Sequence, residues 1–143
     1  MKRLFLASLA SLLTGCAGTR PATLGAHDGR LAPCPSTPNC VCSQGASADH
    51  HIEPLRYQGN PTDARERLLA ALRAMRGARI ITSEPAYVHA EFTSRLLRFV
   101  DDVEFLLTDE GLIHVRSASR IGRSDFGVNR KRIEAVRSAF EGG

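Results

Sequence analysis

The sequence predicts an α+β fold, in which an antiparallel sheet of about four strands carries two helices packed on one face. Apolar side chains recur at helical spacing after residue 60 and again after residue 128. Between these stretches lie four short strand-like runs separated by turn residues. A loop segment dense in Cys, Pro, Ser and His precedes the first helix, and a hydrophobic content of 43% suffices for a packed core.

The first helix is expected to start at Asn60-Pro61, because Asn is a good N-cap residue and Pro is favoured in the first helical turn. Gly77 ends it. The second helix is expected from Val128 to Phe140. The side chains that give the two helices their apolar periodicity are Ala64, Leu68, Leu72 and Met75 in the first, and Ile133, Val136 and Phe140 in the second.

Four strands are expected at residues 79–83, 86–94, 99–107 and 112–120, with a tight turn at Gly111. Side chains alternate between the two faces of a strand, so one face of the sheet is expected to be polar and left uncovered by the helices. Arg116 is expected opposite Asp102 or Glu104, as a cross-strand pair on a solvated face. The alternative is a polar ligand site built from His89, Glu91, Asp102, Glu104, His114 and Arg116.

The amino terminus has the pattern of a secretory signal. Lys2 and Arg3 precede an apolar stretch at residues 4–13, which is too short to cross a bilayer stably. The stretch ends in Leu-Thr-Gly-Cys at residues 13–16, which resembles the lipobox read by bacterial lipoprotein signal peptidase. We therefore expect lipid on Cys16, which anchors the protein to a membrane.

The expected organisation has three parts. Residues 1–15 form the signal peptide, residues 16–32 the lipidated Cys and a flexible spacer, and residues 33–143 a single α+β domain. Ala17 lacks the Asp that resembles an inner-membrane retention signal, which favours the outer membrane, facing the periplasm. Loss of the signal peptide removes two of 19 basic residues and leaves 17 against 15 acidic ones, so no nucleic-acid partner is expected.

Three cysteines remain after Cys16 is lipidated, and export implies an oxidising compartment. A disulfide between Cys34 and Cys40 is expected, because the intervening Pro and Asn residues favour a turn, whereas Cys40 and Cys42 are too close for an unstrained bridge. Unpaired thiols are one alternative. A zinc site is the other, with Cys34, Cys40, Cys42 and either His50 or His51 as ligands, although their spacing matches no common zinc motif. We expect neither a metal nor a cofactor.

A second motif combines arginines, serines and glycines between the last strand and the second helix. Backbone amides at a helix start, together with arginine side chains, favour an anion site. The expected ligand-binding residues are Arg116, Ser117, Ser119, Arg120, Arg123, Ser124, Asp125, Asn129 and Arg130. The favoured alternative is structural, with Asp125 as the helix cap and the arginines in ion pairs. The motif lacks the Gly-Lys-Ser/Thr ending of a Walker loop.

Three stretches, Leu31–Ser43, Tyr87–Phe105 and Ile113–Arg137, together resemble the bacterial family called domain of unknown function 1499. They contain Cys-Pro-x-x-Pro-Asn-Cys-Val, Phe-Val-Asp-Asp-Val-Glu-Phe and Arg-Ser-Ala-Ser-Arg-x-Gly-x-Ser-Asp-x-Gly-Val-Asn-Arg. The family includes members with lipoprotein-type starts. The chain departs from the pattern at Cys42, where members more often have Ser. The resemblance implies no established activity, so it supplies no catalytic residue.

These sequence features are compatible with three functions. The leading hypothesis is a non-enzymatic envelope lipoprotein that binds a polar or anionic ligand through the arginine-containing motif. The second is a structural or assembly lipoprotein that contacts another envelope protein. A hydrolase is the least favoured, because no Gly-x-Ser-x-Gly sequence is present. Its residues would be Ser119 or Ser124, with His89 or His114 and Asp102.

Overall fold

The arrangement of one antiparallel sheet and two helices is given by a computed structural model, which describes residues 17–143. The predicted signal peptide and the predicted lipidation site Cys16 lie outside these residues. The elements follow in the order β1 (Cys40–Cys42), β2 (Leu55–Arg56), α1 (Pro61–Ala74), β3 (Ala78–Ser83), β4 (Tyr87–Thr93), β5 (Val100–Leu107), β6 (Leu112–Ser119) and α2 (Val128–Glu141).

The sheet has six strands in the order β1-β6-β5-β4-β3, and β2 pairs with the other end of β6. Every pairing is antiparallel. The α+β class is therefore confirmed, and the four expected strands are β3 to β6. The count of four is too low, because β1 and β2 lie within the segment expected to be a loop. They are three and two residues long, too short to show a period of two.

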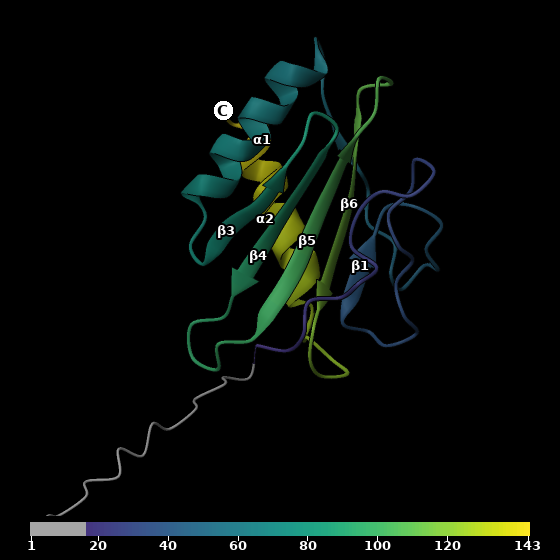
Figure 1. Ribbon diagram of the computed structural model, residues 1–143, viewed down its shortest axis with the longest axis vertical. Helices are drawn as coiled ribbons and strands as arrows, with labels where there is room; N and C mark the ends of the chain where they lie inside the picture. The colour runs from purple at the N-terminus through teal and green to yellow at the C-terminus, as the bar shows by residue number, and fades with distance from the viewer. Residues whose placement is uncertain (1–16) are drawn as a thin grey trace, which may run out of the picture.

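Both helices pack on the same face of the sheet, as Figure 1 shows. Asn60 caps α1 as expected, because its Oδ1 accepts a hydrogen bond of 2.8 Å from the backbone N–H of Asp63. The core lies between the helices and the apolar side chains of β4, β5 and β6. The largest fully buried apolar residues are Leu55, Leu68, Leu72, Val88, Val103, Phe105, Ile113, Val115, Ile133, Val136 and Phe140. Their burial supplies most of the driving force for folding.

Residues 17–31 cross the opposite face of the sheet, and we call them the N-terminal strap (purple in Figure 1). Within the strap, the backbone N–H of Gly25 donates a hydrogen bond of 2.9 Å to Glu104. Leu31 is buried in a small apolar cluster with Tyr87 and Leu106. This segment was expected to be a flexible spacer, and the structure differs. Polar contacts and a few apolar ones hold the strap, so its sequence shows no hydrophobic period.

Candidate functional site

A buried network of charged side chains occupies the sheet face beneath the strap. Arg120 lies at its centre and donates two hydrogen bonds of 2.7 Å to Asp102 and one of 2.5 Å to Glu91. Nε2 of His89 lies 2.8 Å from Oδ1 of Asp102. Arg20 reaches down from the strap and donates to Glu91. Such two-pronged arginine–carboxylate contacts are strong and fix the geometry of both groups.

The antiparallel register explains why these side chains meet. Glu91 of β4 is opposite Asp102 of β5, and Asp102 is opposite Ala118 of β6. Small Ala118 leaves room beside Asp102, and Arg120, the residue directly after β6, extends from the same face of the sheet.

Burial of Glu91 raises its pKa, but hydrogen bonds and attraction from Arg120 and Arg20 outweigh this effect and lower the pKa to about 2. Burial also raises the pKa of Asp102, and again the contacts with Arg120 and His89 outweigh it, so the pKa falls below its usual value. The hydrogen bond to Asp102 raises the pKa of Arg120 above its usual value, against the effect of burial. The network is therefore charged at neutral pH.

A second part of the network is built around Glu104, which is fully buried. Its carboxylate accepts hydrogen bonds from the hydroxyl of Tyr87 at 2.8 Å, from Arg116 at 3.3 Å and from the backbone of Gly25. Arg116 lies directly opposite Glu104, which confirms the expected cross-strand pair. Burial, followed by repulsion from Glu104, raises the pKa of the Tyr87 hydroxyl above its usual value. Within residues 17–143, Arg116 Nε is the buried side-chain polar atom that lacks a hydrogen-bond partner.

The polar face was expected to be open, and this expectation is wrong for its central residues. Asp102 and Glu104 are 1% and 0% exposed, because the strap and neighbouring side chains cover them. Beside this covered centre, a cavity of about 390 Å³ remains between the strap and β3–β4. Its lining includes Arg20, Leu24, Thr82, Tyr87 and His89.

The opposite face of β6 carries a separate hub centred on Asn129, the second residue of α2. Its side-chain amide accepts a hydrogen bond of 2.5 Å from Ser117 and donates to the carbonyl oxygen of Asn39 and to Ser119. Asp125 accepts hydrogen bonds from the backbone N–H groups of Asn129 and Gly127. The N-cap position of α2 is Gly127, not Asp125 as the structural alternative expected, but the Asp125 carboxylate still accepts a hydrogen bond from a first-turn N–H group.

The residues expected to form one anion site are thus divided between separate places. Ser117, Ser119, Asp125 and Asn129 belong to the hub, whereas Arg116 and Arg120 lie under the strap. Arg123 and Ser124 are exposed in the loop between β6 and α2, and Arg130 lines a separate pocket and donates a hydrogen bond to the carbonyl oxygen of Asp49. Residues 116 to 120 alternate between the faces of a strand, so they do not converge on one ligand.

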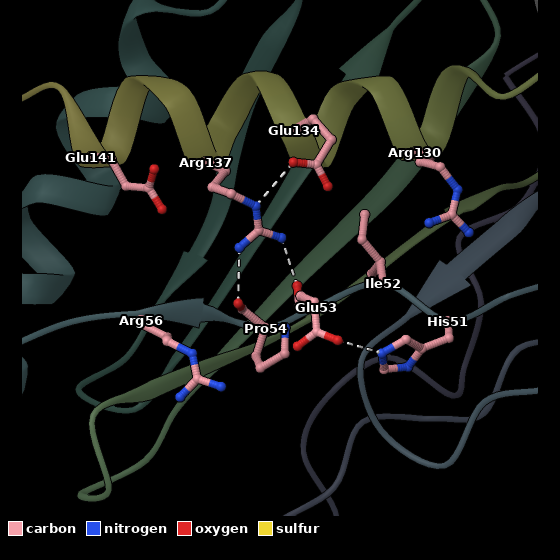
Figure 2. A pocket seen from close by; sticks show the side chains of 9 residues that line it. All are labelled: His51, Ile52, Glu53, Pro54, Arg56, Arg130, Glu134, Arg137 and Glu141. Atoms are coloured by element: carbon pink, nitrogen blue, oxygen red, sulfur yellow. Dashed lines mark hydrogen bonds and ion pairs between the residues drawn. The ribbon is translucent and has the colours of Figure 1, made fainter. Parts of the chain in front are cut away.

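Figure 2 shows the surface on which Arg130 lies, an open pocket of about 480 Å³ between α2 and the segment that leads into β2. Arg137 of α2 holds this segment by donating hydrogen bonds to the carbonyl oxygens of Glu53 and Pro54, and it also contacts Glu134. The lining residues are His51, Ile52, Glu53, Pro54, Arg56, Arg130, Glu134, Arg137 and Glu141. Sequence reasoning missed this pocket. Its lining contains three arginines and three glutamates, so these charges balance and favour neither an anion nor a cation as a ligand.

The expected disulfide between Cys34 and Cys40 is confirmed, with Cα atoms 5.7 Å apart. The alternative zinc site is therefore wrong, because two of its thiols are bonded to each other. No group of three metal-binding side chains occurs within residues 17–143. Cys42 is a free, buried thiol that contacts the carbonyl oxygen of Gln44.

The residues considered for a hydrolase are not brought together. His89 and Asp102 form a pair, but Ser119 points to the opposite face of the sheet, where Asn129 donates to it. Ser124 lies in the loop after β6, and its hydroxyl accepts a hydrogen bond from the backbone of Phe126. His114 is paired with Ser43. The structure thus assembles none of the triads that these residues could form.

Fold and site together define an α+β domain in which an amino-terminal strap covers the centre of the helix-free sheet face. The family described as "Protein of unknown function (DUF1499)" matches residues 30–140, and the chain belongs to this family. The match contains both parts of the charged network on the sheet but not Arg20 or Gly25 of the strap. No curated protein matches the chain. No helix among residues 17–143 is long and apolar enough to cross a membrane.

The network makes the free energy of unfolding decrease as the pH falls into the acid range. The pKa of Glu91 is lower in the folded protein than its ordinary value of 4.5, so the unfolded state binds more protons between these values. Stability from this group is complete above about pH 4.5 and is lost as the pH falls toward 2, with a total on the order of 3 kcal/mol. Denaturant unfolding at pH 7, 4 and 3 measures this loss.

In that experiment Glu91→Gln is the control, because it removes the titrating group and should make stability fall less steeply with acid. Asp102 and Asp125 have lowered pKa values and retain part of the slope. Equal slopes for the wild type and Glu91→Gln between pH 4 and 3 contradict the assignment.

Proposed function

We propose that this chain is a lipid-anchored protein of the cell envelope with a structural or assembly role, and that it contacts another envelope protein. The observation that carries the proposal is the strap, which fixes the chain to the sheet a few residues after the expected lipidation site. Arg20 is four residues after Cys16 and is paired with buried Glu91. A fixed domain of this kind suits a role at a defined position, whereas a ligand carrier on a long tether needs no such strap.

The charge balance on the sheet face also supports a structural role over anion binding by the motif arginines. Arg20, Arg116 and Arg120 face three carboxylates, those of Glu91, Asp102 and Glu104. A bound anion would displace a buried carboxylate from its arginine, and a buried charge without a partner is costly. Arg116 and Arg120, the motif arginines among these three, are thus held in the fold by their carboxylate partners.

A second candidate function, the binding of a small polar ligand, is supported by the cavity between the strap and β3–β4. It presents Arg20, Tyr87 and His89, which supply charge, hydroxyl and imidazole groups to one space of about 390 Å³. This size and mixture of groups suit a small polar molecule. In this second candidate function, the ligand site is this cavity and not the arginine-containing motif that was expected from the sequence.

The experiment purifies the full chain from its own membrane after crosslinking in cells. The intact mass is expected to show a chain that begins at Cys16 and carries acyl groups, together with a reproducible crosslinked protein partner. Arg20→Ala removes the strap's ion pair and should reduce the crosslink. Arg79→Ala is the matched control, because Arg79 contacts the same glutamate from a side chain that is 71% exposed.

Two results contradict the proposal. If the purified chain retains residues 1–15 and carries no acyl groups, the proposed lipid anchor is wrong. A copurified small molecule that is lost in His89→Ala, without any protein partner, favours the second candidate.

A further inference from the structure

The exposed large apolar side chains of residues 17–143 are gathered in two stretches of the surface. One is the loop between β4 and β5, and the other is the loop between β6 and α2 with the first residue of α2. The residues are Leu96, Leu97, Phe99, Ile121, Phe126 and Val128. Leu96 is 90% exposed and Phe126 is 89% exposed. Contiguous exposed apolar residues mark sites of contact with a protein or a membrane.

The two loops lie at the same end of the molecule, as Figure 1 shows. The backbone N–H of Arg120 donates a hydrogen bond to the carbonyl oxygen of Val100, which joins the bases of the two loops. We call residues 94–99 and 120–128 together the apolar tip. Arg95, Arg98 and Arg123 are exposed among its apolar side chains. Its one acidic residue, Asp125, already accepts hydrogen bonds from the backbone N–H groups of Gly127 and Asn129.

The backbone of the tip is strained at two positions that carry side chains. Arg98 and Phe126 have φ angles of 56° and 52°, in the left-handed region that such residues rarely adopt. Phe126 gains no packing in return, because its ring is almost wholly exposed. Backbone strain that is not compensated by packing within the domain is typical of binding sites.

The chain also approaches its expected anchor at this tip. Gly18 packs closely against it, since a Cβ on Gly18 would lie 2.9 Å from Cβ of Arg120 and 3.0 Å from Cγ1 of Ile121. Gly18 is two residues after position 16, and two extended residues span at most about 7 Å. A lipid on Cys16, as expected from the sequence, would therefore be attached close to the tip.

We propose that the apolar tip docks on the bilayer that holds the lipid anchor. Its leucines and phenylalanines enter the headgroup boundary, and its arginines bind the phosphates of anionic lipids. The inference rests on the proposed lipidation of Cys16, because that lipid brings the tip to a membrane. A bilayer fits this surface because apolar and cationic groups are mixed on two loops next to the anchor.

The experiment uses single-Trp variants, since the chain contains no Trp. Leu97→Trp and Phe126→Trp report on the tip, and Glu110→Trp, in the turn at the other end of β5 and β6, is the control. The lipidated full chains are placed in vesicles of phosphatidylcholine with or without phosphatidylglycerol, containing lipids brominated on their acyl chains. The fluorescence of the two tip variants is expected to shift to shorter wavelength and to be quenched, whereas that of the control is not.

Arg98→Gln, introduced into Leu97→Trp, should weaken the docking equilibrium on vesicles with phosphatidylglycerol by about fivefold. Arg56→Gln, which lies opposite Leu112 at the other end of β6, should leave it unchanged. Tip fluorescence that matches the control in every vesicle overturns the docking. A blue shift without vesicles assigns the tip to a second copy of the chain and also overturns it.

The intact mass of the same preparation separates this inference from the proposed function. If the chains are acylated but the tip Trp residues are not quenched, docking of the tip is refuted and the lipid anchor stands. If the chains carry no acyl groups, the lipid anchor is refuted. Quenching of the tip Trp residues after vesicles are added to such chains still supports docking of the tip.

Discussion

Arg120→Ala is expected to lower the free energy of unfolding by about 3–5 kcal/mol, the largest effect of any single substitution on the sheet face. Arg120 neutralises two carboxylates, those of Asp102 and Glu91, and both are buried. Without the guanidinium, Asp102 retains only His89 as a partner, and Glu91 retains Arg20 and Arg79, both more exposed. Two carboxylates then face each other in a poorly solvated space, which is why the cost exceeds that of an ordinary ion pair.

Arg123→Ala is the matched control, because Arg123 lies three residues further along the chain and is exposed. Its substitution should change stability by no more than about 0.5 kcal/mol. Denaturant unfolding at pH 7 measures both variants. If Arg120→Ala and Arg123→Ala are equally stable, the network contributes nothing and the proposed role of the strap fails with it.

Asn129→Ala is expected to cost about 2–4 kcal/mol. The Asn129 side chain is fully buried and bridges α2 to Ser117 and Ser119 of β6 and to the carbonyl oxygen of Asn39 beside β1. Its removal leaves several buried polar groups without partners at once, in addition to a small cavity. The effect should appear as a lower denaturant midpoint at unchanged slope.

Lys131→Ala provides the comparison on the same helix, since Lys131 is exposed and two residues away. Its midpoint should stay within experimental error of the wild type, because Ala is also the better helix former. An Asn129→Ala midpoint equal to that of Lys131→Ala shows that the hub does not hold the helix to the sheet.

The features predicted from sequence are those that depend on short-range periodicity. Alternation along β4, β5 and β6 separated the core side chains from the polar ones, and it placed Arg116 opposite a carboxylate, which is Glu104. Pro and Asn residues between Cys34 and Cys40 indicated the disulfide. Each of these inferences needs only a turn or a strand, so the sequence carries the signal locally.

Features that depend on distant contacts were not predicted. The strap is held by single residues, such as Arg20 on Glu91, which is 71 residues away in the sequence. β1 and β2 are strands only because β6 provides a hydrogen-bonding edge. Without knowledge of these contacts, the polar face appeared open and residues 16–32 appeared to be a free spacer.

The candidate site could be predicted only in part, because residues that are neighbours in the motif from Arg116 to Asn129 are not neighbours in space. Residues 116 and 118 share one face of β6 with residue 120, which follows the strand, and residues 117 and 119 share the other face. This alternation separates the arginines from the serines, so they do not form a single anion site.

Amide hydrogen exchange of the strap tests most directly whether the segment after the anchor is fixed to the sheet. The N–H groups of Gly25 and Leu31 donate to Glu104 and Gln44, whereas Leu97 lies in an exposed loop. We expect the two strap amides to exchange at least about tenfold more slowly than that of Leu97, after correction for intrinsic rates. Strap amides that exchange at the rate of an unstructured chain contradict the account, because they leave the sheet face open and the domain on a free tether.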